Sequence, residues 1–329
     1  MERSILDSDL EEIFQRTKEE SNHLKNTRIL ILGGTGFLGS WLVESLLYIN
    51  KRNRLKLQVT APARNPKKLA YLQDSSLTII PHSFGSNALT PKGESYDFVF
   101  HALTPTVETD LSPVLGITNK LLDEIQSWKS PPRFVHLSSG AVYPSTVTLN
   151  GPIIEQEAYS LSELSLYGKL KLAIEQRVQI GTKEGLINGV NPRLFAFTGP
   201  RLPLDAHFAI GNFMRQGLLG EDIEVKGNSR TMRSYMHPVD AIVWILKCGI
   251  SNLSSIFHIG SNSALTMEEI ASHVARLFET GVKLTSENHT ISRYVPETIK
   301  TQHLLNVKQE IGIENALSRW REWHLMKSE

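Results

Sequence analysis

Residues 28–39 read RILILGGTGFLG, and this stretch decides the fold class of the chain. Its first five residues form an apolar run of strand length, and the segment WLVESLLYI, which begins at Trp41, repeats apolar residues at helical period. A strand that enters a helix through a glycine turn needs glycines for backbone conformation, for close approach of a diphosphate and for packing. A plain structural turn is the alternative, and the flanking strand and helix disfavour it. The residues expected to bind a dinucleotide diphosphate here are Gly33, Thr35, Gly36, Phe37, Leu38 and Gly39.

Further apolar runs of strand length alternate with helical patterns after this turn. The alternation predicts βαβ units and a parallel sheet covered by helices on both faces. We therefore predict an α/β protein with a Rossmann-type, doubly wound parallel sheet. The expected strands are 28–32, 55–61, 77–80, 97–102, 133–138 and 186–190, and the expected helices are 66–72, 113–128, 164–180 and 206–219.

The length of 329 residues corresponds to about two domains. Residues 1–26 carry apolar residues at helical spacing among many charges, which predicts an N-terminal helical extension. Residues 27–198 are predicted to form the dinucleotide-binding domain. Residues 199–329, with expected strands at 223–226 and 256–259 and helices at 238–249 and 266–279, are predicted to form a smaller substrate-binding lobe interleaved with the first domain.

Composition excludes several classes of protein. Lys+Arg total 35 and Asp+Glu 34, so a net charge of +1 gives no support for nucleic-acid binding. The lone Cys248 excludes a disulfide framework, and the 11 histidines show no metal-ligand spacing, so no metal site is expected. There is no run of about 18 apolar residues for a membrane helix, and the acidic start lacks a secretory signal. We expect a cytoplasmic protein with no membrane partner.

Residues with catalytic chemistry follow the expected strand at 133–138. The run SSGAVYP begins at Ser138, and the motif YGKLK on an expected helix contains Tyr167 and Lys171. Tyr and Lys at positions i and i+4 share one helix face, so the ammonium can favour the phenolate. Lowering the phenol pKa to neutrality requires about 4 kcal/mol. We predict that Ser139 hydrogen-bonds the reacting oxygen, that Tyr167 moves its proton, and that Lys171 holds the ribose of a nicotinamide cofactor that transfers hydride.

The loop after the second expected strand bears on which cofactor is used. NAD sites usually place a carboxylate there, but this chain has Arg64 followed by Lys67 and Lys68. Arg64 could pair with a 2′-phosphate, so NADP(H) is favoured over NAD(H). A solvated loop charge is the alternative reading of Arg64. Ala102 and Leu103, at the end of another strand, are further expected cofactor contacts.

These motifs resemble those of the extended short-chain dehydrogenases/reductases, the NAD-dependent epimerase/dehydratase family that modifies nucleotide-activated sugars. The stretches FAFTGPR from Phe195, RSYMHPVD from Arg233 and FHIGS from Phe257 also match. The resemblance implies an oxidoreductase with a nucleotide-sugar substrate, whose diphosphate Arg233 would grip. It also implies a homodimer that pairs through the helices near 113–128 and 164–180. The expected substrate contacts are Ser139, Tyr143, Asn212 and Arg233.

Departures from the family pattern indicate which reaction to expect. Family dehydratases carry an Asp-Glu pair where this chain has Gly140 and Ala141, which cannot transfer protons. Hydride transfer at C4 of the sugar then remains as the expected reaction. Because the chain lacks the carboxylate that would bind the adenosine ribose of NAD, NADPH and hence a 4-keto-sugar reductase are favoured. A 4-epimerase is the alternative, followed by a dehydratase or decarboxylase. A non-catalytic regulator is disfavoured because Ser139, Tyr167 and Lys171 occur together. Two other candidate acid/base groups, His101 and His136, are expected to be structural histidines on apolar strands.

Overall fold

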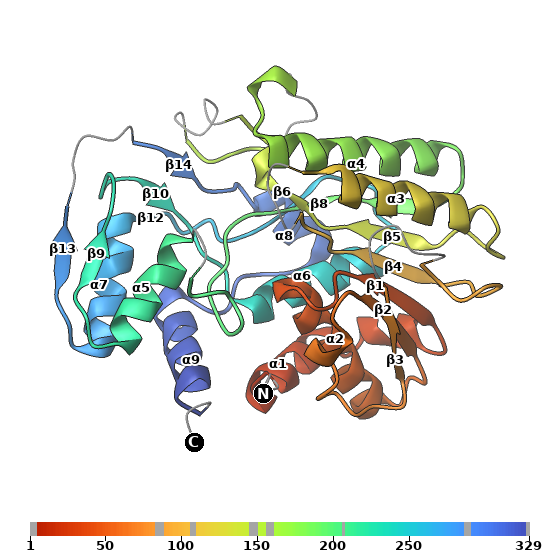
Figure 1. The fold of residues 1–329 in the computed structure, drawn as a ribbon, viewed down its shortest axis with the longest axis horizontal. Coiled ribbons are helices and arrows are strands. Elements are labelled where there is room, and N and C mark those ends of the chain that lie inside the picture. Colours follow the sequence, from red (N-terminus) through yellow and green to blue (C-terminus); the bar gives the residue numbers. More distant parts are fainter. Residues whose placement is uncertain are drawn as a thin grey trace. The chain divides into compact units, whose positions relative to one another are not determined.

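The computed structural model describes residues 5–82, 89–105, 110–144, 151–155, 161–205, 208–285 and 291–326. The chain divides into two compact units, and each is assembled from separated stretches (Figure 1). Unit 1 comprises residues 1–142, 157–194 and 242–257, and unit 2 comprises residues 143–156, 195–241 and 258–329. Parts of the predicted segments, at 1–4, 206–207 and 327–329, lie outside the described residues.

The helices of the described residues are α1 (Asp7–Thr17), α2 (Phe37–Asn53), α3 (Ser112–Ile125), α4 (Leu166–Lys183), α5 (Ala209–Leu218), α6 (Pro238–Ile250), α7 (Met267–Phe278), α8 (Ile299–Leu305) and α9 (Ile313–Met326). The strands are β1 (Arg28–Leu32), β2 (Gln58–Ala63), β3 (Leu77–Pro81), β4 (Phe98–His101), β5 (Arg133–His136), β6 (Ser138–Ser139), β7 (Asn188–Val190), β8 (Pro192–Leu194), β9 (Ile223–Val225), β10 (Met232–Arg233), β11 (Phe257–Ile259), β12 (Leu265–Thr266), β13 (Val282–Leu284) and β14 (Arg293–Tyr294).

Unit 1 is built on a six-stranded sheet in the order β3-β2-β1-β4-β5-β7. Every neighbouring pair in this sheet is parallel. The predicted α/β class with a doubly wound parallel sheet is therefore confirmed. The strand order reverses between β1 and β4, and in open α/β sheets ligands bind beyond the carboxyl ends of the strands at such a point.

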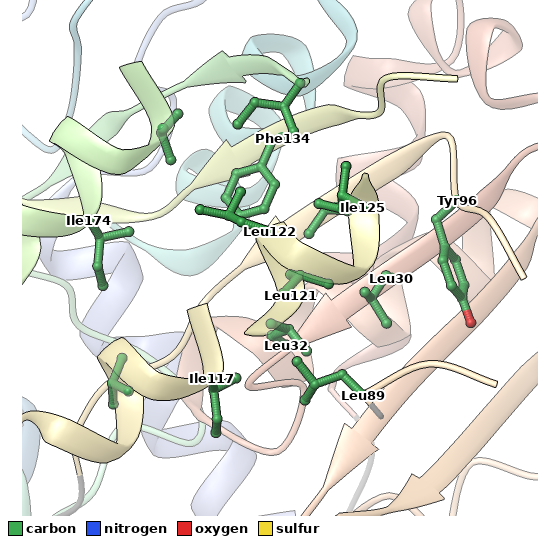
Figure 2. Close-up of a cluster of buried hydrophobic side chains, with 14 of the residues drawn as sticks. Leu30, Leu32, Leu89, Tyr96, Ile117, Leu121, Leu122, Ile125, Phe134 and Ile174 are labelled. Carbon is green, nitrogen blue, oxygen red and sulfur yellow. The ribbon is translucent and has the colours of Figure 1, made fainter. Parts of the chain in front are cut away.

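One face of the sheet packs against α3 and α4, which run side by side in Figure 1. Alternate residues of each strand face this side, because side chains alternate along a strand. Figure 2 shows Leu30 and Phe134 of the sheet among Leu121 and Ile125 of α3 and Ile174 of α4. Burying each large apolar side chain stabilises the fold by about 1.5–3 kcal/mol.

The residues between those positions face the opposite side of the sheet. Here α6 approaches closely, and a Cβ added at Gly249 would lie 3.2 Å from the Phe100 ring and 3.3 Å from a Val135 methyl group. The buried Arg133 side chain fixes this end of α6, because it donates to the carbonyls of Cys248, Gly249 and Leu253. These bonds connect β5 to a segment more than a hundred residues later in the sequence.

The N-terminal segment packs against α2. Ile13 and Phe14 of α1 are buried, and the backbone N–H of Ile5 donates to the buried Glu44 carboxylate of α2 at 3.0 Å. The Tyr71 hydroxyl donates to the same carboxylate. In the described part of the chain, no helix combines the length and the apolar character needed to cross a membrane.

Unit 2 contains small sheets and five described helices or helix parts around them. β10 pairs antiparallel with β12 and parallel with β14, and β9 pairs parallel with β13. Helix α5 lies against α7 closely enough that a Cβ at Gly217 would meet the Phe278 ring at 2.2 Å. The expected helices at 238–249 and 266–279 correspond to α6 and α7.

Candidate active site

The glycine turn forms a tight cradle at the carboxyl end of β1. Gly33 has a φ of +82°, and a Cβ there would lie 2.5 Å from the Ala102 carbonyl oxygen. A Cβ at Gly39 would lie 2.0 Å from the Gly33 carbonyl oxygen. Gly36 is the N-cap of α2 and makes no side-chain cap. Backbone N–H groups at a helix start without a side-chain cap suit an anion, so these residues fit the diphosphate of a dinucleotide.

The loop after β2 presents cations. Arg64 directly follows β2 and is exposed, and Lys67 and Lys68 are exposed in a short 3₁₀ turn, Pro66–Lys68. Residues 63–68 contain no carboxylate. This placement agrees with a contact to the adenosine side of a dinucleotide, and the choice between NAD and NADP stays a prediction.

The three predicted catalytic residues come together in unit 1. The Ser139 side chain lies close enough to the Tyr167 hydroxyl to lower its pKa, and the Lys171 Nζ lies 5.7 Å from the centroid of the Tyr167 ring. Two features place the start of α4 for this contact. The Ser165 hydroxyl caps the helix by accepting from the Gly168 N–H at 3.1 Å, and a Cβ at Gly168 would lie 2.1 Å from the Ala141 carbonyl oxygen.

Lys171 is buried and is held by backbone carbonyls. Its Nζ donates to the Leu137 oxygen at 2.7 Å and to the Leu103 oxygen at 3.1 Å. An ammonium has three N–H donors, so one donor remains for a ligand such as a ribose hydroxyl. Burial lowers the pKa of Lys171 to about 7, and the Glu175 carboxylate opposes this effect.

The surroundings of Tyr167 within the chain alone disfavour its phenolate. Burial raises the pKa of Tyr167 to about 12, and the hydrogen bond from Ser139 only partly opposes it. The pKa of the phenol is therefore not lowered by the chain itself, because desolvation of the phenolate outweighs the effect of Ser139.

His101 and His136 form a buried pair beneath this site. Their Nδ1 atoms are 3.1 Å apart, and the His101 Nε2 lies 2.9 Å from the Thr118 hydroxyl. Burial lowers the pKa of His101 to about 3 and that of His136 well below its usual value. Both rings are thus neutral near pH 7, as structural histidines would be.

The segment after Ser139 carries no group for acid/base chemistry. Gly140 and Ala141 lie in a 3₁₀ turn, Gly140–Val142. The Ala141 N–H donates to the Ser139 Oγ at 3.1 Å. Among the described residues, no three His, Cys, Asp or Glu side chains gather in a way that could hold a metal ion.

The other predicted substrate contacts belong to unit 2. Arg233 is partly exposed on β10, and its Nη1 donates to the Met232 carbonyl at 2.8 Å and to the Ser292 hydroxyl at 3.1 Å. Tyr143 is buried, and its hydroxyl lies 2.6 Å from the His258 Nε2. Asn212 lies on α5, and its side chain donates to the Phe208 carbonyl at 3.3 Å.

Sequence reasoning missed several residues that support the site. Ser138, Glu175 and Arg193 form a buried polar cluster behind Lys171. Glu175 stands four residues after Lys171, so its helical spacing was a visible signal. The contribution of Arg193 had no such signal, because only the fold brings β8 beside β6.

Comparison with known proteins gives one family and many relatives. Residues 29–260, about 70% of the chain, match the family described as NAD dependent epimerase/dehydratase. UDP-glucuronic acid decarboxylase 3 of Arabidopsis thaliana is 24% identical over 316 residues, which cover 90% of this chain and 89% of that protein.

Solved structures share the fold. A UDP-glucuronic acid 4-epimerase from Bacillus cereus in complex with NAD has a TM-score of 0.76 and 21% identity, covering 92% of this chain and 98% of that chain. MoeE5 in complex with UDP-glucose and NAD has a TM-score of 0.74 and 24% identity, covering 92% of this chain and all of that chain. At these identities the likeness shows the fold alone.

Proposed function

Because the chain belongs to the NAD-dependent epimerase/dehydratase family of enzymes, we propose that it is an NAD(H)-dependent 4-epimerase of a nucleotide sugar. The observation that carries this proposal is the group Ser139, Tyr167 and Lys171 beside the glycine cradle, with no proton-transfer group at Gly140 or Ala141. This set can move one proton and support one hydride transfer. It lacks the additional acid and base that elimination of water requires.

The candidate site residues have distinct roles in this reaction. When held by the glycine turn and Lys171, a nicotinamide cofactor would supply reversible hydride transfer at C4 of the sugar, and epimerisation requires that the hydride return to the opposite face of the ketone. Tyr167 takes the proton from the C4 hydroxyl and later gives it back, so protons balance over a full turnover. Ser139 hydrogen-bonds the same oxygen, and Lys171 favours the phenolate and holds the ribose. Arg233 would bind the diphosphate through its remaining guanidinium N–H groups.

One comparison supports an epimerase over the 4-keto-sugar reductase. The reductase reading depends on Arg64 as a partner of a 2′-phosphate, whereas the solved structures named above contain NAD. NADP(H) with net reduction remains the alternative.

A decarboxylase is the second candidate, because curated relatives act on UDP-glucuronic acid by name. Hydride loss from C4 to a bound nicotinamide, with Tyr167 taking the hydroxyl proton, would leave the carboxylate on C5 β to a ketone, so loss of CO₂ would follow from the same first step. The two candidates therefore share the first oxidation step and differ in what happens to the ketone.

The decisive experiment has two stages. Purified protein is denatured and any released NAD(H) or NADP(H) is identified by chromatography; then UDP-glucuronic acid, UDP-glucose and UDP-N-acetylglucosamine are each incubated with enzyme and NAD. A 4-epimer formed without net change in NADH supports the proposal. UDP-pentose with CO₂ would establish the decarboxylase, and turnover only with stoichiometric NADPH consumption would establish the reductase. Tyr167→Phe protein is the matched control for contaminating activity.

The role of Arg64 is tested separately by cofactor titration. We expect Arg64→Ala to change NAD affinity by less than about threefold, because a 2′-hydroxyl gives a guanidinium no anionic partner. A selective loss of NADP affinity of tenfold or more would restore the NADP reading. Lys129→Ala, a change at an exposed lysine outside this loop, is the control.

We also propose that the protein is a homodimer. Leu166 and Ile180, both half exposed, lie fourteen residues apart and so share the outer face of α4. Light scattering with size-exclusion chromatography should give twice the chain mass of 36.9 kDa, and Ile180→Asp should lower the measured mass to that of one chain.

A further inference from the structure

The carboxylate of Glu175 on α4 is buried and accepts hydrogen bonds from three donor groups. Arg193 donates to it twice, from Nε at 3.0 Å and from Nη2 at 2.8 Å. The Ser138 hydroxyl donates to the same carboxylate. The side chains of Glu175 and Arg193 are each only 2% exposed. Stability alone does not account for such a pair, because a buried ion pair is often no more stabilising than apolar residues of the same volume.

The position of this cluster relates it to the candidate catalytic residues. Tyr167, Lys171 and Glu175 follow one another at intervals of four, so they share one face of α4. The strand end opposite supplies one partner for each. Ser139 contacts Tyr167, Ser138 contacts Glu175, and the carbonyl of Leu137 accepts from Lys171.

Arg193 completes the cluster from the next strand. Ser138 and Arg193 are register partners in the parallel pair of β6 and β8. The guanidinium and the hydroxyl therefore reach Glu175 from adjacent positions of one small sheet. A planar guanidinium bound to both carboxylate oxygens fixes the orientation of that carboxylate.

Among the described residues that act electrostatically on Lys171, Glu175 supplies the negative charge. His101 on β4 and His136 on β5 are neutral near pH 7. Tyr167 is a neutral phenol at that pH, and Arg193 is a cation. Glu175 is the group whose charge favours the ammonium form of Lys171, against the cost of burial.

We propose that Ser138 and Arg193 position the Glu175 carboxylate one helical turn after Lys171, and that this negative charge keeps the Lys171 amine protonated. None of the three touches the reacting atoms in this role. The cluster serves the proton transfer of the proposed function, because a neutral Lys171 would no longer favour the Tyr167 phenolate. It also gives Ser138, the first serine of the SSGAVYP motif, a task distinct from that of Ser139.

The proposal is tested by following the titration of Lys171 by NMR in protein labelled with [6-¹³C]lysine. The Lys171 signal is assigned by its loss in Lys171→Met. Glu175→Gln should lower the midpoint of this titration by at least about one unit, a tenfold change in proton affinity. Arg193→Gln should raise it, because it removes a cation and leaves the carboxylate without its main partner.

Opposite shifts separate this role from a structural one. Both substitutions break the same ion pair, so a purely structural pair would move both midpoints in one direction or leave both at the wild-type value. Either of those results would overturn the proposal. Arg133→Gln, which disturbs another buried arginine of unit 1, is the control and should leave the Lys171 midpoint unchanged.

A double variant covers the case in which a single variant does not fold. Glu175→Gln with Arg193→Gln leaves no unpaired buried charge. The midpoint of the Lys171 titration in this double variant should lie below that of the wild type and above that of Glu175→Gln. An unchanged midpoint would refute the proposal. The titration needs no sugar, so it is independent of the substrate tests. With an active substrate, the high-pH limb of kcat should move in the same order among the variants.

Discussion

At the scale of single residues, Lys171 has two opposed requirements. Its charge is needed beside the Tyr167 phenol, but burial disfavours that charge and lowers the pKa of the amine to about 7. Two carbonyl acceptors and the Glu175 carboxylate partly compensate. Stability given up at a functional residue in this way is a common cost of a preorganised site.

This opposition predicts how stability depends on pH. The pKa of Lys171 is about 7 in the folded chain and 10.5 when unperturbed, so between these values the unfolded chain binds more protons and stability rises with pH. Below about pH 7 both forms are charged and the full penalty of burial is present. We expect the free energy of unfolding of the wild type, relative to Lys171→Met, to increase from pH 7 to pH 9, by at most about 1.4 kcal/mol per pH unit. Urea unfolding at several pH values measures this, and a flat difference would contradict it.

The Tyr167 hydroxyl gives the second prediction at this scale. Tyr167→Phe keeps the ring but removes the group that moves the proton. We expect kcat to fall by about 10²–10⁴-fold, the usual size of a general acid/base contribution, while NAD affinity by calorimetry changes less than about threefold. Retention of wild-type turnover would remove Tyr167 from the mechanism.

At the scale of elements, glycines decide how closely α2 and α4 approach their neighbours. A Cβ at Gly39 would overlap the Gly33 carbonyl, and one at Gly168 would overlap the Ala141 carbonyl. Gly39 thus lets the start of α2 contact the backbone of the glycine turn that precedes it. Gly168 lets the start of α4 contact the backbone of the turn Gly140–Val142. The diphosphate cradle and the Tyr167–Ser139 contact depend on these approaches.

A matched pair of alanine substitutions tests this reading. Gly39→Ala forces backbone to shift, so we expect at least a tenfold loss of NAD affinity and a loss of about 1–3 kcal/mol in stability. Gly116→Ala, within α3, meets nothing within 4 Å and should instead gain about 0.5–1 kcal/mol. Thermal unfolding and cofactor titration of both variants give the answer. Equal behaviour of the two would show that the close approach at Gly39 is unimportant.

Elements also show where sequence reasoning succeeds and where it stops. The strand at 28–32 was predicted to the residue, and α4 and α7 within three residues. The second strand was predicted to start at Leu55, but β2 begins at Gln58. Leu55 and Leu57 are buried but do not pair with a neighbouring strand, and Lys56 between them has a φ of +59°. Their apolar side chains therefore indicate burial and not a strand.

Other features lay beyond what a local pattern can reveal. Strands β10, β12 and β14 are two residues long, which is too short to show any period. For the site, spacing and motif were enough to pair Tyr167 with Lys171, because both lie on one helix. The contribution of Arg193 to Glu175 depends on three separated segments meeting, which only the fold establishes.

At the scale of the whole molecule, each unit is assembled from stretches far apart in the sequence. Unit 1 needs residues 242–257, which the chain supplies only after the segment 195–241 of unit 2. The Arg133 guanidinium holds this returning segment through three carbonyls, and Asn188 of β7 accepts from it at 2.8 Å.

Arg133 therefore should matter to global stability more than a surface charge does. Arg133→Met removes the guanidinium donors from the carbonyls of Cys248, Gly249 and Leu253, and we expect it to lower the free energy of unfolding by about 2–4 kcal/mol in urea titrations. Arg52→Met, which removes a partly exposed ion pair with Glu11, should cost less than about 1 kcal/mol. A smaller effect at Arg133 than at Arg52 would contradict this account.

The late arrival of α6 has a consequence for synthesis on the ribosome. The sheet face that carries Phe100 and Val135 is complete when about half of the chain has been made, but Gly249, which covers it, emerges much later. During that interval the nascent chain exposes an apolar surface that invites aggregation. We expect a chaperone that binds apolar segments to remain on the nascent chain until α6 has left the exit tunnel, and to dissociate as the helix docks.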